Sequence, residues 1–393
     1  MRTLSGIELS GRRVLVRFDF NVPLHEGRIL DDTRLRASLP TLHELLDRGA
    51  RIIILAHLGR PKGPDAGLSL APIAAALGEM LQRPIPLLAQ PEEALHMGSS
   101  SLLMLENLRF WPGEEANDQG FAQTLARAGD LYVNDAFAVS HRAHASVAAI
   151  TQCLPSCAGR LMEKELTALR ETLEHPKRPL MAIVGGSKVS TKLELLENLI
   201  RQVDVLALGG GIANTFLLAQ GKDMGASLVE ASLVPQAHAI LQAAQGRCQI
   251  LLPEDVRVAP HLAQGQQART CSVDGIGSDE MVLDWGPRTL AMWAEALTQV
   301  KSVIWNGPVG AFEYPPFDEA SLMIAKTLAR ATTDGHIKTL AGGGETIAVL
   351  NQARVFDQFS YVSTAGGAFL EYLEGKLLSG VAALMEAKDK LSA

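Results

Sequence analysis

The stretch MAIVGGSKVSTKLELLENL, residues 181–199, decides the fold that this chain predicts. The apolar run 180–184 predicts a buried strand, and the pattern from Leu193 onward predicts a helix. Gly185 and Gly186 between them allow a tight turn and a close approach of the backbone to a ligand. Free N–H groups and the helix dipole converge at such a turn. The stretch therefore predicts a strand–turn–helix unit that binds an anion.

Two lysines beside the glycine turn strengthen this interpretation. Lys188 and Lys192 lie there although the helix dipole disfavours positive charge in a first turn. Sequences depart from such a local preference mainly where function requires the disfavoured residue. Thr191 and Glu194 have the spacing of a capping box, which predicts that Ser190 or Thr191 caps the helix. We predict a phosphate site here; two solvated lysines at an ordinary helix start are the alternative.

Length and composition indicate a globular protein with two domains. The 393 residues exceed what one core holds comfortably, and 47% of them are hydrophobic. The net charge of -7 argues against nucleic acid as the main partner, so any basic site must be local. The four cysteines lack C-x-x-C pairing, and no apolar run can span a bilayer. These features predict reduced thiols in a soluble, cytoplasmic protein that is not bound to a membrane.

Strand-like apolar runs alternate with helical patterns along the whole chain. The runs are residues 14–16, 52–55, 102–105, 131–133, 180–184, 205–208, 303–305 and 339–341. The helical patterns include residues 35–47, 70–81, 121–128 and 193–202. This alternation predicts an α/β protein with doubly wound parallel sheets, in which ligands bind beyond the carboxyl ends of the strands.

The residues that follow the predicted strands divide the chain into two halves. Charged and polar groups in or near the strand-end loops of the first half are Arg17, Asp19, Asn21, Arg34, His57, Arg60, Arg109, His141, Arg142 and His144. Arginines that converge at the strand ends would select a small polyanion, because each planar guanidinium can donate two parallel hydrogen bonds to phosphate or carboxylate oxygens. Asp19 and Asn21 either orient hydroxyls and arginines or serve turn chemistry before Pro23. Both interpretations stay open.

Glycine turns follow the strands of the second half, at residues 185–188, 209–216, 342–346 and 363–369. They match neither the P-loop nor the dinucleotide fingerprint. In the fragment GGGET, Glu345 and Thr346 begin a helix and could hold magnesium directly or through water; a favourable first-turn acid is the alternative for Glu345. Glu313 is a candidate for ribose hydroxyls, and its apolar neighbours suit a purine pocket. The second half thus predicts a nucleotide site.

A charged helical stretch at residues 161–179 separates the two halves and ends in two prolines. We expect two doubly wound parallel-sheet domains joined by an interdomain helix and hinge. The N-terminal domain is expected at residues 1–165, the interdomain helix and linker at 166–179, and the C-terminal domain at 180–376.

Nine motifs occur in the order seen in the phosphoglycerate kinase family, which the chain resembles over essentially its whole length. They are VRFDFNVP, HLGRPKGP, NLRF, VNDAFAVSHRAHAS, GGSKVSTK, GGGIANTF, WNGPVGAFE, GGGET and STAGGAFLE. The resemblance implies reversible glycolytic phosphoryl transfer from 1,3-bisphosphoglycerate to ADP, giving 3-phosphoglycerate and ATP with magnesium. It also implies a monomer, glycerate binding by the N-terminal domain and nucleotide binding by the C-terminal domain. Residues 377–393 are expected to return and pack on the N-terminal domain.

The resemblance assigns roles residue by residue. Implied glycerate-binding residues are Asp19, Asn21, Arg34, His57, Leu58, Gly59, Arg60, Arg109 and Arg142. Implied nucleotide-binding residues are Gly185, Lys188, Lys192, Gly209, Glu313, Gly343, Gly344, Glu345 and Thr346, with Glu345 as the metal ligand. Implied catalytic residues are Arg34, Lys188, Gly366 and Gly367.

Three positions depart from the family pattern. Glu345 stands where aspartate is usual, so the metal carboxylate is one methylene longer. Phe18 replaces a smaller apolar residue, and Ala365 replaces a glycine. None of the three removes a charged group.

The implied reaction needs no general base, because both phosphoryl acceptors are already anionic. Catalysis should consist of alignment and of neutralising charge on the moving phosphoryl group, which we expect from Lys188 and Arg34 after hinge closure. Two other classes of protein are alternatives. One is a Rossmann-type dehydrogenase with His57 or His141 as acid–base; the other is a module that binds both ligands without turnover.

Overall fold

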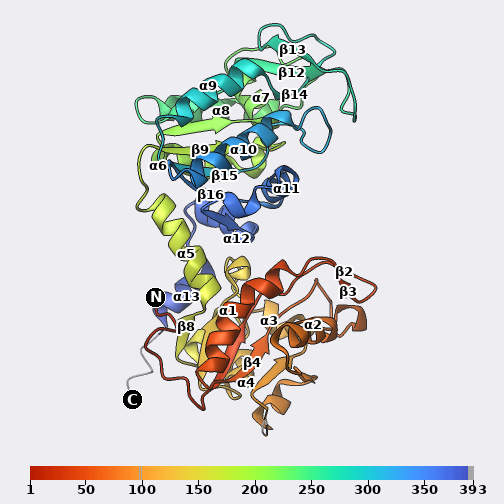
Figure 1. Ribbon diagram of the computed structural model, residues 1–393, viewed down its shortest axis with the longest axis vertical. Helices are drawn as coiled ribbons and strands as arrows, with labels where there is room; N and C mark the ends of the chain where they lie inside the picture. The colour runs from red at the N-terminus through yellow and green to blue at the C-terminus, as the bar shows by residue number, and fades with distance from the viewer. Residues whose placement is uncertain (97, 99, 388–393) are drawn as a thin grey trace. The chain divides into compact units, whose positions relative to one another are not determined.

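The computed structural model describes residues 1–96, 98 and 100–387 (Figure 1). Its internal contacts divide the chain into two compact units. The first unit is Met1–Leu166 together with residues 377–387, and the second unit is Thr167–Lys376. The division falls inside helix α5 (Arg160–Leu173), whose second half belongs with the second unit. The separate linker expected at residues 166–179 is therefore, by these contacts, part of the second unit.

A six-stranded sheet forms the centre of the first unit, and all its pairings are parallel. In sheet order the strands are β5 (Leu87–Leu88), β6 (Leu102–Leu105), β4 (Arg51–Leu55), β1 (Arg13–Arg17), β7 (Leu131–Asn134) and β8 (Ser156–Ala158). The longer helices are α1 (Thr33–Asp47), α2 (Ala71–Leu81), α4 (Gln119–Ala126) and α13 (Ser379–Glu386), and the shorter elements are β2 (Leu24–His25), β3 (Arg28–Ile29), α3 (Pro112–Glu115), η1 (Ala66–Leu68), η2 (Pro91–His96), η3 (Leu108–Phe110), η4 (Phe137–Val139) and η5 (Ala149–Gln152).

Alternation along β1 shows why this sheet is buried on both faces. Val14 and Val16 join one apolar cluster with residues of α1 and α2, whereas Leu15 joins a second cluster with residues of α4. Successive side chains of a strand point to opposite faces, so a continuous apolar run supplies both clusters. The alternating apolar runs of the sequence thus produce a sheet covered on both sides.

The C-terminal helix α13 packs on the first unit. The amide of Gly380 donates to the Ser140 carbonyl at 2.7 Å, and a Cβ atom at position 380 would lie 2.7 Å from Cγ1 of Val147. Residues 388–393 of the expected returning segment lie outside the described residues.

A second six-stranded parallel sheet forms the centre of the second unit. In sheet order its strands are β11 (Gln249–Leu251), β10 (Val205–Leu208), β9 (Leu180–Val184), β15 (Ser302–Asn306), β16 (Lys338–Gly342) and β17 (Tyr361–Ser363). The helices are α6 (Leu193–Gln202), α7 (Gly210–Ala219), α8 (Val234–Ala244), α9 (Pro287–Leu297), α10 (Glu319–Thr333), α11 (Gly344–Ala353) and α12 (Gly367–Leu373), with short turns η6 (Val189–Thr191), η7 (Ala231–Leu233) and η8 (Phe356–Gln358).

The sequence analysis missed two sheets, the two-stranded antiparallel sheet of β2 and β3 and a larger one in the second unit. Strands β12 (Asp255–Ala259), β13 (Arg269–Ser272) and β14 (Met281–Trp285) form an antiparallel sheet in the order β13–β12–β14. Residues of β13 are largely exposed and polar, so this strand carries no apolar run. Among the described residues, no helix is both long and apolar enough to cross a membrane.

The predicted capping box at the start of α6 is wrong. Lys192 occupies the N-cap position and makes no side-chain cap hydrogen bond. Thr191 Oγ1 instead donates to the Lys188 carbonyl at 2.9 Å, and Ser190 binds Glu230. The turn η6 intervenes between strand and helix and moves both hydroxyls away from the helix end.

Candidate active site

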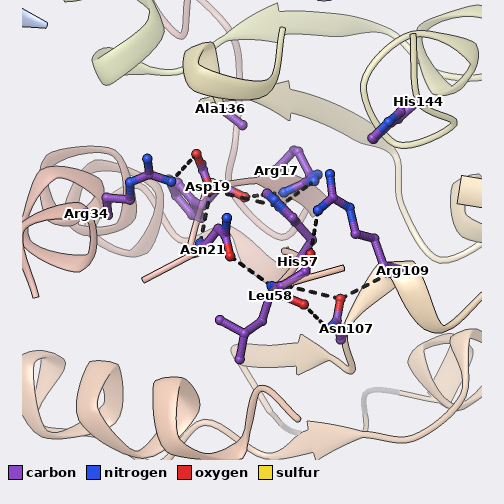
Figure 2. Close-up of polar contacts among 12 residues, drawn as sticks. Arg17, Asp19, Asn21, Arg34, His57, Leu58, Asn107, Arg109, Ala136 and His144 are labelled. Carbon is purple, nitrogen blue, oxygen red and sulfur yellow. Dashed lines mark hydrogen bonds and ion pairs between the residues drawn. The ribbon is translucent and has the colours of Figure 1, made fainter. Parts of the chain in front are cut away.

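Polar residues gather at the carboxyl ends of four neighbouring strands of the first unit, β6, β4, β1 and β7 (Figure 2). Asp19 and Asn21 follow β1, His57 follows β4, and Arg109 lies in η3 after β6. Parallel strands present their carboxyl ends at one edge of a sheet, so side chains distant in sequence meet there.

Asp19 connects the loop after β1 with helix α1. Arg34, in the first turn of α1, forms an ion pair with the Asp19 carboxylate, which also accepts from the Asn21 amide at 3.0 Å. The Asn21 side chain accepts from the Gly59 amide at 2.8 Å. Both interpretations of Asp19 and Asn21 therefore apply, because they form a turn and also orient neighbouring groups.

Asn107 organises the backbone between β4 and the arginine of η3. Its side chain accepts from the Leu58 amide at 3.2 Å and donates to the Leu58 carbonyl at 2.7 Å. Arg109 then donates from Nη1 to the Gly59 carbonyl at 2.5 Å. Leu58 itself is buried in the core, with both backbone groups bound to Asn107. Leu58 is a packing residue whose backbone groups bind Asn107, a structural residue that the sequence analysis overlooked. The implied glycerate role of Leu58 stays a prediction.

His57 is almost fully buried beside several positive charges. Burial and the neighbouring Arg17, Arg109, His144 and Arg34 lower the pKa of His57 well below its ordinary value. His57 is therefore a neutral hydrogen-bonding group at neutral pH.

The remaining arginines differ in exposure. Arg60 is exposed, and Arg142 is half-buried with Nε 3.2 Å from His141 Nε2. Burial lowers the pKa of Arg109. Arg17, placed among the strand-end groups from the sequence, is fully buried at the end of β1. It cannot contact a ligand directly, because none of its surface reaches the site.

In the second unit, Lys192 bridges the ends of two strands. Its Nζ donates to the Gly185 carbonyl at 2.7 Å and to the Asn306 carbonyl at 3.1 Å. Burial lowers the pKa of Lys192 to about 8, against the opposing attraction of the Glu345 carboxylate. An ammonium group has three donors, so one remains for a ligand.

A cavity of about 220 Å³ lies near this lysine: a Cβ atom at Gly186, which lines the cavity, would lie 3.5 Å from Lys192 Nζ. Its lining combines glycine turns, apolar side chains and two carboxylates. The residues are Gly186, Ser187, Gly210, Gly211, Asn214, Leu228, Leu262, Met281, Val282, Leu283, Pro308, Gly310, Ala311, Phe312, Glu313 and Glu345. Several apolar members come from the antiparallel sheet region, so the sequence analysis identified only part of this lining.

Gly185 and Gly209, which the resemblance assigned to nucleotide binding, lie next in sequence to glycines that line the cavity. Gly185 packs so closely that a Cβ atom would lie 1.7 Å from the Pro308 carbonyl oxygen. At Gly209 a Cβ atom would lie 2.5 Å from Cα of Val309. Neither lines the cavity; Gly186, Gly210 and Gly211 do. Backbone atoms surround the Cα positions of Gly185 and Gly209, which explains why both are glycine. Their implied nucleotide role stays a prediction.

The turn before α11 presents one carboxylate to the cavity. Gly343 has a φ of 100° at the N-cap, and Glu345 follows in the first turn. Thr346 is fully buried, and its hydroxyl accepts from the Gly307 amide at 2.7 Å. The Thr346 side chain supports this turn, and the nucleotide role implied for Thr346 stays a prediction.

Glu345 has the donor chemistry that magnesium requires. Magnesium in nucleotide sites keeps several waters and takes one or two protein carboxylates together with substrate phosphates. The Glu345 carboxylate at the cavity wall fits that pattern. Within the described residues, no group of three or more His, Cys, Asp or Glu side chains could hold a metal ion by itself.

The implied catalytic groups of the second unit are exposed. Lys188 precedes η6, and Gly366, with a φ of 56°, is the N-cap of α12 before the exposed Gly367. Two of the positions that depart from the family pattern are packed in the interior: Phe18 stacks on Phe20 with ring centroids 5.3 Å apart, and Ala365 is buried.

Arginines at the strand ends of one α/β unit (Figure 2) and a cavity lined by glycines on the other are typical of a phosphotransferase of the two-domain kinase class. The family model described as phosphoglycerate kinase matches residues 4–376. The phosphoglycerate kinase of Azorhizobium caulinodans is 52% identical over 390 residues, covering 98% of both chains. The chain therefore belongs to the phosphoglycerate kinase family.

Two solved structures agree with this assignment. Phosphoglycerate kinase from Coxiella burnetii superposes with a TM-score of 0.93 at 41% identity, covering 98% of this chain and 99% of that one. Phosphoglycerate kinase from Pyrococcus horikoshii superposes with a TM-score of 0.81 at 28% identity, covering 98% of both chains. The two parallel-sheet α/β units predicted from the sequence are confirmed.

The chain is a kinase of glycolysis that transfers a phosphoryl group reversibly between 1,3-bisphosphoglycerate and ADP. The dehydrogenase alternative is wrong, since the family is one of kinases. The alternative of a binding module without turnover is set aside for the same reason.

Proposed function

We propose that the strand-end cluster of the first unit binds the glycerate substrate. Asp19 and Asn21 orient its hydroxyl, His57 donates a hydrogen bond, and the arginines 60, 109 and 142 bind its carboxyl and phosphate oxygens. The positioning of Arg109 through Gly59 and Asn107 supports this proposal, because it holds the guanidinium in one place at the strand ends. Each charge-assisted hydrogen bond contributes roughly 1.5–3 kcal/mol.

The cavity of the second unit is the proposed site of ADP and ATP. Apolar side chains from residues 228–283 would cover the base, Glu313 would accept from the ribose, and backbone amides of the glycine turns would bind phosphate oxygens. Lys192 neutralises phosphate charge with its remaining donor. Glu345 would hold magnesium, which neutralises nucleotide phosphate charge when bound. The single observation that carries this assignment is a cavity lined by Gly186, Gly210 and Gly211 together with Glu345.

Catalysis is proposed to consist of alignment and charge neutralisation. The acceptor is a phosphate oxygen of ADP or the carboxylate of 3-phosphoglycerate; neither needs a base to remove a proton. Lys188 and Arg34 neutralise the moving phosphoryl group, and Gly366 and Gly367 offer backbone amides to it. Transfer needs donor and acceptor in line, so the two units must close on each other during turnover. We further propose a cytoplasmic monomer that acts on small molecules and binds neither nucleic acid nor membranes.

The test is substrate binding to variants of each unit. Isothermal titration should show that Arg109→Ala weakens 3-phosphoglycerate binding at least tenfold while ADP binding stays within twofold. Glu313→Gln should weaken ADP binding at least tenfold while 3-phosphoglycerate binding stays within twofold. Equal loss of both ligands in both variants would refute the division of the two sites between the units.

A further inference from the structure

A buried polar network lies behind the strand-end cluster and includes no residue proposed to touch substrate other than His57. Arg17 is fully buried at the end of β1, and its Nε donates to Ser146 Oγ at 2.8 Å. Ser146 donates in turn to Glu114 Oε1 at 2.6 Å, and Glu114 is also fully buried. Arg17 Nη1 binds the Phe18 carbonyl. The guanidinium is therefore held from two sides.

The third nitrogen of this guanidinium faces His57. Arg17 Nη2 lies 3.2 Å from His57 Nδ1, as the dashed contact in Figure 2 shows. A guanidinium has donors and no acceptor, and it stays charged in proteins. The imidazole nitrogen that faces it can only accept, so it carries no proton. In a neutral imidazole the proton must then be on the other nitrogen, Nε2.

We infer that Arg17 is a positioning residue that holds His57 in the neutral form protonated at Nε2, so that this N–H donates to an oxygen of the glycerate substrate. The inference deepens the proposed function and rests on it for the identity of the ligand.

Neighbouring groups exclude the other protonation states of His57. An imidazolium would place a proton on Nδ1 against the donor of Arg17, with the charges of Arg34 and Arg109 adding to the repulsion. The Nδ1-protonated form would need an acceptor for that proton. The nearest carboxylate oxygen, Asp19 Oδ1, lies 3.9 Å from Nδ1 and is too far for a hydrogen bond.

The arrangement has a functional consequence. A neutral imidazole with a fixed N–H donor binds an anionic oxygen without adding another buried positive charge beside Arg17 and Arg109. His57 thereby differs from the arginines around it: its N–H fixes the direction of one hydrogen bond, and the arginines supply positive charge.

Nitrogen-15 NMR of the whole protein tests the inference directly. Histidine labelled with nitrogen-15 should show a pyridine-type Nδ1 and a pyrrole-type Nε2 for His57 at pH 7, with signals assigned by their loss in His57→Gln. A pyrrole-type Nδ1 in the wild-type protein would overturn the inference. This spectrum needs no ligand and no variant of Arg17. If added 3-phosphoglycerate then leaves the His57 signals unmoved, the proposed glycerate site fails while the Arg17 assignment stands.

A kinetic cycle separates positioning from a merely structural role. The pair Arg17→Met with Glu114→Gln removes the buried charges together, and it should raise the KM for 3-phosphoglycerate roughly tenfold to hundredfold. In a His57→Gln background, whose amide donates without help from Arg17, the same pair should change KM less than threefold. An undiminished effect there would overturn the inference. Arg13→Gln, at the other end of β1, is the matched control and should leave KM unchanged.

Discussion

The Nζ atom of Lys192 donates a hydrogen bond of 2.7 Å to the carbonyl of Gly185, at the end of β9. The same Nζ reaches the Asn306 carbonyl at the end of β15, which pairs with β9 in the sheet. A lysine at the start of a helix is thus held by two strand ends, and carbonyl dipoles offset its unfavourable place beside the positive end of the helix dipole. The sequence anomaly of a cation in the first turn has a structural explanation.

The first prediction concerns pH. Burial lowers the pKa of Lys192 to about 8, so the amine is charged below that pH and increasingly neutral above it. The neutral amine no longer offsets phosphate charge. Titration calorimetry should therefore show ADP affinity of the wild-type protein falling about tenfold between pH 7 and pH 9.5.

Lys192→Arg is the control for this pH effect, because the guanidinium stays charged over the whole range. The ADP affinity of Lys192→Arg can be lower overall but should fall less than threefold between pH 7 and pH 9.5. A parallel decline in both proteins would assign the pH dependence to another group.

The second prediction concerns packing at the turn. A Cβ atom at position 185 would lie 1.7 Å from the Pro308 carbonyl oxygen, which is backbone and cannot rotate away. Gly185→Ala should lower the free energy of unfolding by about 3 kcal/mol, measured by urea denaturation. Gly275→Ala is the control, because its Cβ would have only ordinary contacts beginning at 3.5 Å. Equal stability of the two variants would show that the turn rearranges freely.

The third prediction concerns Asn107. Removing its side chain leaves the amide and carbonyl of Leu58 and the carbonyl of Leu68 without these partners. Asn107→Ala should cost about 3 kcal/mol in the free energy of unfolding. It should also raise the KM for 3-phosphoglycerate, because Arg109 is positioned through Gly59 and Asn107. A destabilised variant with an unchanged KM would separate Asn107 from the substrate site.

The fourth prediction concerns the metal. Glu345→Gln should raise the magnesium concentration for half-maximal rate at least tenfold, because the amide is a weaker ligand. Glu345→Asp should keep it within about threefold, since aspartate is the usual residue of the family at this position. Glu313 lines the same cavity, so Glu313→Gln serves as the control. It should change the KM for ADP and leave the magnesium concentration for half-maximal rate unchanged. An unaltered magnesium curve in Glu345→Gln would exclude Glu345 as a ligand.

The sequence predicted the sheets better than the details of the site. Buried parallel strands are continuous apolar runs, so strands such as β6 and β9 coincide with the predicted ranges. The three-stranded antiparallel sheet was missed, and its strand β13 has no such run. Its absence from the prediction also left out the cavity residues Met281, Val282 and Leu283 of β14.

Glycines that line the cavity could not be distinguished from packing glycines in the sequence. Gly185 and Gly209 are excluded from the cavity wall by the chain at Pro308 and Val309, which is distant in sequence. Arg17 presents the same difficulty, since only Glu114 and Ser146, from other segments, make its full burial possible. Such contacts depend on tertiary structure and not on local pattern.

The most direct test of the account is phosphoryl transfer itself. ATP consumption with 3-phosphoglycerate and magnesium, coupled to reductive trapping of the acyl phosphate, should give turnover in the wild-type protein. Lys188→Ala and Arg34→Ala should each lower kcat about 100-fold to 1,000-fold. Arg36→Ala, an exposed arginine of the same helix paired with Asp32, should stay within twofold. Near-full turnover in Lys188→Ala or Arg34→Ala would contradict charge neutralisation by these residues as the basis of catalysis.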